Sequence, residues 1–206
     1  MKELQALANR NAEELRRLYA RIGETLPHRS SSGAGRATWE AACREFHERF
    51  DDLFFPGGES AWTGFVRGES AFVENALAFL EADPWSFRSG YCKQVVWRRL
   101  KRLPLNTEDH LRLEQVALSY LPKRVRWEFW HMAKYMRIRG STDFWGTVER
   151  HATSSARTPS AIKAGWLLLA RVNAPVRRCI WRELLRAKYE PGHTPTLDFW
   201  SARHET

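Results

Sequence analysis

The chain has 206 residues, of which 43% are hydrophobic, and its 33 Lys/Arg against 24 Asp/Glu give a formal net charge of +9. A chain of this length buries a sizeable core as one domain, so we expect a single body over residues 1–206. Three cysteines without a Cys-x-x-Cys pair argue against a disulfide framework or a zinc site, and no apolar run is long enough for a membrane span. We expect a cytoplasmic protein with no bound metal or cofactor.

Helical periodicity dominates the chain, and no segment alternates apolar and polar residues for long. Apolar stripes, capping residues and Pro/Gly breaks mark where the helices begin and end. We predict helices over residues 2–22, 38–54, 68–81, 89–102, 107–121, 122–140, 142–153, 159–172 and 175–188. Pro, Ser and Gly residues predict a mobile linker near 25–37, and Pro191, Gly192 and Pro195 predict a loosely docked tail over 190–206. The fold class is therefore all-α.

The spacing of the later helix starts suggests stacked helical pairs. Ser89, Pro122 and Pro159 lie 33 and 37 residues apart, and each interval holds a short break between two helices. This pattern, clearest in 159–164 followed by 173–178, resembles the HEAT and armadillo repeat proteins. The resemblance implies an irregular array of antiparallel helical pairs that presents a curved binding surface. A compact multi-helix bundle is the alternative architecture.

The positive charge is concentrated in the middle of the chain. Residues 84–140 hold thirteen Lys/Arg against four Asp/Glu, a net +9, whereas residues 1–83 carry −4 and residues 141–206 carry +4. Such polarity creates a field that attracts an anionic partner to one part of the molecule. Arginine supplies 26 of the 33 basic residues, and its guanidinium group binds phosphates and carboxylates in a bidentate manner.

Cationic side chains on the outward faces of the predicted helices, together with one interleaved tryptophan, form the predicted binding surface. These residues are Arg88, Lys93, Arg98, Lys101, Arg102, Arg126, Trp130, Lys134 and Arg137. A tryptophan among cations can stack on a nucleic-acid base or hold an arginine by a cation–π contact. Alternatively, Trp130 fills the interface with the next helix, as aromatic side chains commonly do.

Three functions are compatible with these features. The first is a non-catalytic binding module whose basic, aromatic-rich surface engages DNA, RNA or an acidic protein. The second is a protein–protein interaction subunit of a bacterial assembly, of the immunity or defence type, with a conventional aromatic interface. The third is a nucleic-acid-acting enzyme similar to the HEAT-like DNA glycosylases, although no position matches their catalytic aspartate and no phosphate loop or nucleophile motif occurs.

Overall fold

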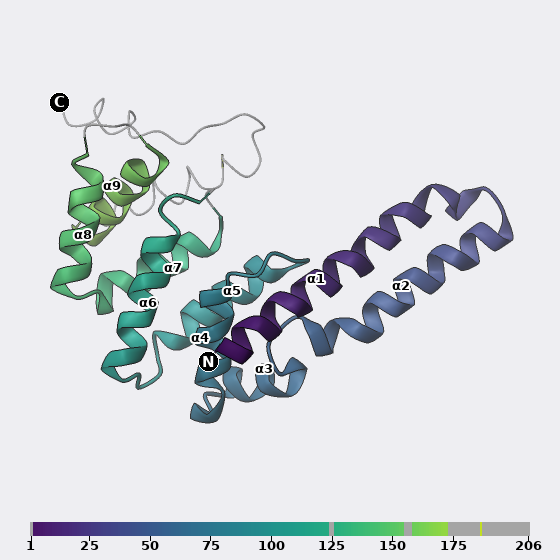
Figure 1. The fold of residues 1–206 in the computed structure, drawn as a ribbon, viewed down its shortest axis with the longest axis horizontal. Helices are drawn as coiled ribbons and strands as arrows, with labels where there is room; N and C mark the ends of the chain where they lie inside the picture. Colours follow the sequence, from purple (N-terminus) through teal and green to yellow (C-terminus); the bar gives the residue numbers. More distant parts are fainter. Residues whose placement is uncertain (1, 124–125, 155–157, 173–185, 187–206) are drawn as a thin grey trace. The chain divides into compact units, whose positions relative to one another are not determined.

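A computed structural model describes residues 2–123, 126–154, 158–172 and 186 (Figure 1). All regular elements among these residues are helical, which confirms the all-α class. They are α1 (Lys2–Thr25), the 3-10 helix η1 (Leu26–Ser30), α2 (Gly33–Leu53), α3 (Gly58–Arg67), the 3-10 helix η2 (Ser70–Phe72), α4 (Val73–Ala82), α5 (Ser89–Leu100), α6 (Thr107–Ser119), α7 (Glu128–Arg139), α8 (Thr142–Ala152) and α9 (Pro159–Val172). The contacts of the chain fall into two compact units, Met1–Leu103 and Pro104–Thr206.

In the first unit, α1 and α2 lie side by side as a long antiparallel hairpin (Figure 1). Leucines of α1 pack against an aromatic residue of α2, and Leu15, Leu18 and Phe46 form a buried cluster. Phe50 and Leu53 extend this cluster toward the end of α2. Burial of these side chains stabilises a pair of helices that would each be marginal alone.

The hairpin connection coincides with the segment predicted as a linker. Residues 25–37 contain η1 and the first residues of α2, which begins at Gly33 and not at Thr38. Ser32 accounts for this difference, because its hydroxyl oxygen accepts a hydrogen bond of 3.0 Å from the backbone N–H of Gly35 and so caps the helix. Glycine and serine content alone pointed to irregular chain, whereas the cap and the partner helix favour helical geometry.

Helix α3 was absent from the prediction, which placed no helix between residues 54 and 68. Gly57 and Gly58 both adopt positive φ, at 86° and 66°, and these glycines start a ten-residue helix in place of a turn. The predicted helix near 68–81 is present as η2 and α4, whose residues 76–80 are all buried. Because α4 packs against α1, α3 and α5, it is the centre of the first unit.

The second unit is built from α6 to α9. Helix α7 packs against α6 and α9, and α9 packs against α8. At its core, the rings of Phe129 and Trp166 meet edge to face with centroids 6.2 Å apart. The buried carboxylate of Glu114 accepts hydrogen bonds from the backbone N–H of Ser141 at 2.6 Å and from its hydroxyl at 3.0 Å. These contacts fix the start of α8 against α6.

Two boundaries of the second unit differ from the prediction or fall beyond the described chain. Helix α7 begins at Glu128, not at Pro122, because the chain bends at Leu121–Lys123 before it becomes helical. The helix predicted over 175–188 and the tail over 190–206 lie outside the described residues, apart from residue 186. Over the part of the chain that is described, no helix has both the length and the apolar character that crossing a membrane requires.

Candidate anion-binding site

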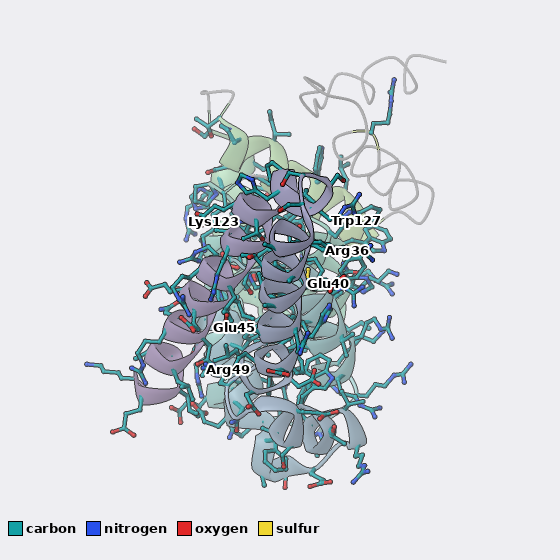
Figure 2. The ribbon with its side chains drawn as sticks, turned by 90° about the vertical axis from the view of Figure 1, so that its right-hand side faces the viewer. Arg36, Glu40, Glu45, Arg49, Lys123 and Trp127 are labelled. Atoms are coloured by element: carbon teal, nitrogen blue, oxygen red, sulfur yellow. The ribbon has the colours of Figure 1, made fainter. Side chains whose placement is uncertain are left out.

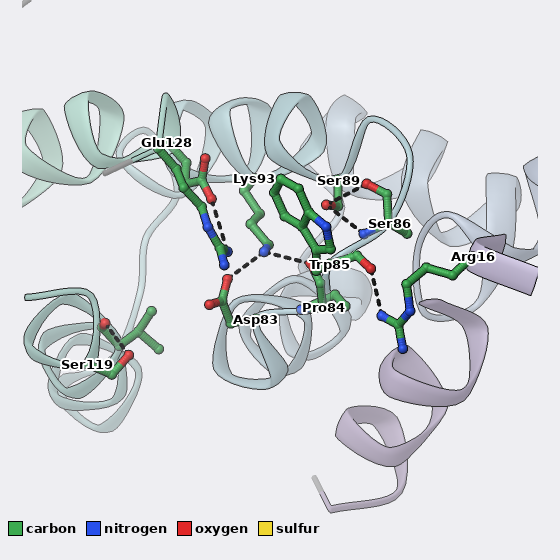
Figure 3. Close-up of polar contacts among 11 residues, drawn as sticks. Arg16, Asp83, Pro84, Trp85, Ser86, Ser89, Lys93, Ser119 and Glu128 are labelled. Carbon is green, nitrogen blue, oxygen red and sulfur yellow. Dashed lines mark hydrogen bonds and ion pairs between the residues drawn. The ribbon is translucent and has the colours of Figure 1, made fainter. Parts of the chain in front are cut away.

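Polar contacts hold the turn between α4 and α5 (Figure 3), whose aromatic residues Trp85 and Phe87 are exposed. Arg16 donates to the carbonyl of Trp85 at 2.7 Å, and the hydroxyl of Ser89 accepts from the N–H of Ser86 and donates to its carbonyl. Lys93 donates to Asp83 and to the carbonyl of Pro84. The turn, residues 83–88, is therefore preorganised.

Lys93 belongs to this internal network and not to a binding surface, which corrects its predicted role. Its side chain is fully buried, and its Nζ lies 2.5 Å from Oδ1 of Asp83 and 2.7 Å from the carbonyl oxygen of Pro84. A buried ammonium group requires such partners, because burying the charge without them costs roughly several kcal/mol. Helical periodicity placed Lys93 on the outward face of its helix, and only the partners in the preceding turn show that the position is internal.

A stripe of exposed side chains follows α5 from its first turn to its end. Tyr91 and Arg98 lie seven residues apart and so share one side of α5, and Arg102 follows two residues after the helix ends at Leu100. All three are exposed, whereas Val96, Trp97 and Leu100 on the other side are buried. We call Tyr91, Val95, Arg98 and Arg102 the α5 stripe.

A hollow of about 200 Å³ opens on the C-terminal half of this stripe. It is lined by Val66 of α3 and by Val95, Arg98, Arg99 and Arg102. Two valines thus supply apolar lining, and three arginines supply positive charge and hydrogen-bond donors. Arg98 and Arg99 also occupy the last turn of α5, where the negative end of the helix dipole favours cations.

The arginines of the hollow have no acidic neighbours in sequence and no acidic partner among the residues that the structure describes. Residues 84–103 contain six Lys/Arg and no Asp/Glu. Across the described residues, the side chains of Arg98, Arg99 and Arg102 make no hydrogen bond or ion pair, and the Nε of Arg99 is buried without an acceptor. A buried donor without a partner is costly, so this site has an unused capacity to bind an anion.

Several arginines on the α1/α2 hairpin behave differently, because they pair with carboxylates. Figure 2 shows charged side chains spaced along α2, among them Arg36 and Glu40, which form an ion pair of 2.9 Å. Arg21 pairs with Glu45 at 2.5 Å. These solvated pairs neutralise part of the surface charge of the hairpin, whereas the arginines that line the hollow have no carboxylate partner among the described residues.

The other predicted residues of the first unit take lesser positions. Arg88 is exposed at the N-terminal boundary of α5, where its φ of 61° is unusual for a side chain with a Cβ, and its guanidinium lies 5.3 Å from the ring centroid of Phe87. Lys101 is half-buried at the C-cap of α5 and does not line the hollow.

Arg99 and Val66 line the hollow but were not among the predicted site residues. The spacing of Arg99 from Val95 and Arg102 was the available signal for Arg99, whereas nothing in the sequence indicated Val66.

The remaining four predicted residues lie in the second unit. Trp130 is buried, with 8% of its surface exposed, and the ammonium of Lys134 lies 4.8 Å from its ring centroid. The core interpretation of Trp130 therefore replaces base stacking. Arg126 is half-buried and lies 3.8 Å from the carboxylate of Glu128, and Arg137 is exposed near the end of α7.

A histidine–tyrosine pair is the main titratable contact elsewhere in the second unit. Nδ1 of His110 lies 2.6 Å from the hydroxyl oxygen of Tyr135, which joins α6 to α7. Burial lowers the pKa of His110, with Arg139 adding to the effect, and burial raises the pKa of Tyr135. No group of three or more His, Cys, Asp or Glu side chains with metal-binding geometry occurs within the described ranges.

A second hollow, of about 400 Å³, lies beside α3 and η2 in the first unit. Its polar lining includes the carboxylates of Glu59 and Glu69 as well as Arg67. Because the two carboxylates outnumber the single guanidinium, this hollow is a poorer anion site than the one on α5.

No protein-family model, curated protein or solved structure matches the chain. The anion-binding assignment therefore depends on the residues that line the hollow.

Proposed function

We propose that the protein is a non-catalytic nucleic-acid-binding module that holds phosphate groups in the hollow formed by Arg98, Arg99 and Arg102. The observation that carries the proposal is that three arginines, without acidic partners in the described chain, line one hollow together with two valines. Guanidinium groups bind phosphate through bidentate, charge-assisted hydrogen bonds. The HEAT- or armadillo-like arrangement of helical pairs remains part of this proposal as the scaffold that presents the site.

The size of the hollow supports a phosphate on a larger partner over a free small molecule. Pockets that enclose a whole small ligand usually measure about 300–1,000 Å³. The hollow on α5, at about 200 Å³, suits one anionic group that belongs to a chain running past the helix. Nucleic acid provides such groups at regular intervals, and neutralising them releases condensed counterions.

Salt dependence of binding tests the proposal. Fluorescence anisotropy with labelled single-stranded and duplex DNA, between about 50 and 200 mM salt, should give a log–log slope that becomes shallower by about 0.7–0.9 for each phosphate contact removed. The double variant Arg98→Gln/Arg102→Gln should therefore reduce the slope by about 1.4–1.8 and weaken binding at every salt concentration.

The matched control removes the same charge from the same unit. Arg10 and Arg44 are exposed on α1 and α2, and the variant Arg10→Gln/Arg44→Gln changes the net charge equally. It should leave the slope close to that of the wild type. Equal effects of the two double variants would show attraction by net charge without a site, and preferential binding of an acidic polypeptide over DNA would favour the acidic-protein partner.

A further inference from the structure

Tyr91 is an exposed ring on the same stripe as the arginine hollow. Its side chain is 62% exposed, and among the described residues its ring makes no aromatic, cation–π or hydrogen-bonded contact. Seven residues separate it from Arg98, which corresponds to a rise of about 10 Å along α5 at about 1.5 Å per residue. A ligand that lies along the stripe thus meets one aromatic face before it reaches the hollow.

The turn that leads into α5 holds this end of the helix in place. Ser89 fixes its own first turn through two hydrogen bonds to Ser86, and Lys93 holds the turn from inside at Asp83 and Pro84 (Figure 3). Tyr91 lies between these two anchors in the sequence. A ring on a rigid element loses little conformational entropy when a ligand stacks on it.

We infer that the α5 stripe selects single-stranded nucleic acid, with a base stacked on Tyr91 while a phosphate of the same strand occupies the hollow around Arg98, Arg99 and Arg102. This inference rests on the proposed function and adds the class of partner. Bases in a duplex are already stacked on one another and present only their edges, so only an unpaired base can offer its face to Tyr91. Guanidinium groups that bind the backbone and rings that stack on bases are the two components of single-strand recognition.

Two Tyr91 variants and three probes test the inference. The probes are a labelled single-stranded DNA, its duplex, and an abasic single strand, which keeps the phosphates but has no bases. Wild-type protein should bind the single strand more tightly than either of the others. Tyr91→Ala should weaken binding to the single strand by about tenfold, within the range expected for one stacked base, and should change affinity for the abasic strand little.

The conservative variant Tyr91→Phe keeps the ring and should retain wild-type preference, because stacking does not need the hydroxyl group. Thermal unfolding of Tyr91→Ala should match that of the wild type, since the side chain is mostly exposed. Single-strand affinity that is unchanged in Tyr91→Ala, or equal wild-type affinity for single strand and duplex, would overturn the single-strand inference. The phosphate hollow would survive that result if Arg98→Gln/Arg102→Gln still lost binding. A wild-type protein that binds none of the three probes would overturn both proposals.

Discussion

The Nζ atom of Lys93 donates a hydrogen bond of 2.5 Å to Oδ1 of Asp83 in the interior of the first unit, where the Lys93 side chain is fully buried and that of Asp83 is 9% exposed. Asp83 itself adopts a left-handed conformation, with φ at 44°, at the end of α4. The pair thus joins the strained end of one helix to the middle of the next.

Lys93→Met should destabilise the protein by about 3–5 kcal/mol, because it removes the ammonium group that faces a buried carboxylate. Urea denaturation measures this loss. Lys101→Met is the control on the same helix, since Lys101 is only half-buried, and it should change the unfolding free energy by less than about 0.5 kcal/mol. Asp83→Asn combined with Lys93→Met should recover part of the loss, and strictly additive effects would show that the two side chains do not stabilise each other.

Gly64 is required by a close approach between α3 and η2. A Cβ built at this position would lie 2.2 Å from Cε2 and 2.3 Å from Cδ2 of Phe72. Gly64→Ala should therefore cost about 1–3 kcal/mol, because the Phe72 ring must move out of its place. Gly23 in α1 is the matched control. A Cβ there meets nothing within 4 Å, so Gly23→Ala should raise stability by up to about 1 kcal/mol. The same sign for both variants, measured by thermal unfolding, would contradict the close contact.

The stability of a Trp130 variant shows whether this residue belongs to the core or to a binding surface. With 8% of its surface exposed, Trp130→Ala should reduce the free energy of unfolding by about 3–5 kcal/mol. Tyr91→Ala removes another aromatic ring, but one that is 62% exposed, and should leave stability nearly unchanged. Thermal unfolding of the two variants checks this contrast. An unaltered melting temperature of Trp130→Ala would contradict the assignment of Trp130 to the core.

Lys163 should make the stability of the second unit depend on pH. Its Nζ donates to the carbonyl oxygens of Tyr120, at 3.4 Å, and Lys123, and burial lowers its pKa from 10.5 to about 8. Between these values the folded protein holds fewer protons at this site than the unfolded chain does. The contribution of Lys163 to the unfolding free energy therefore rises as pH increases from about 8 to 10.5.

Lys163→Met isolates this effect, because the variant lacks the titrating group while it keeps an apolar side chain of similar length. Chemical denaturation of both proteins at about pH 7 and pH 10 gives the relevant comparison. The wild type should gain stability relative to Lys163→Met at the higher pH. A difference between the two proteins that stays constant with pH would show that the pKa of Lys163 is not shifted by folding.

The sequence by itself determined the helical class, most helix boundaries and the location of the basic segment. Apolar residues three and four apart, with Ser, Thr or Pro at helix starts, produced the correct elements over α1, α4 to α6, α8 and α9, because local backbone geometry and one buried face dictate that pattern. The absence of acidic residues between 84 and 103 likewise needs no structure to be seen. These properties are local along the chain.

Only the tertiary structure decided which cations are accessible and what lies next to them. Lys93 and Arg98 look equivalent as basic residues of one helix, yet Lys93 is internal because Asp83 and Pro84 meet it from the preceding turn, whereas Arg98 reaches the surface. The hollow likewise depends on α3, which the prediction missed because it begins at two glycines. This helix brings Val66 to the side of α5. Periodicity defines the faces of a helix, but the neighbours that cover a face come from distant parts of the chain, and burial therefore cannot be read from spacing alone.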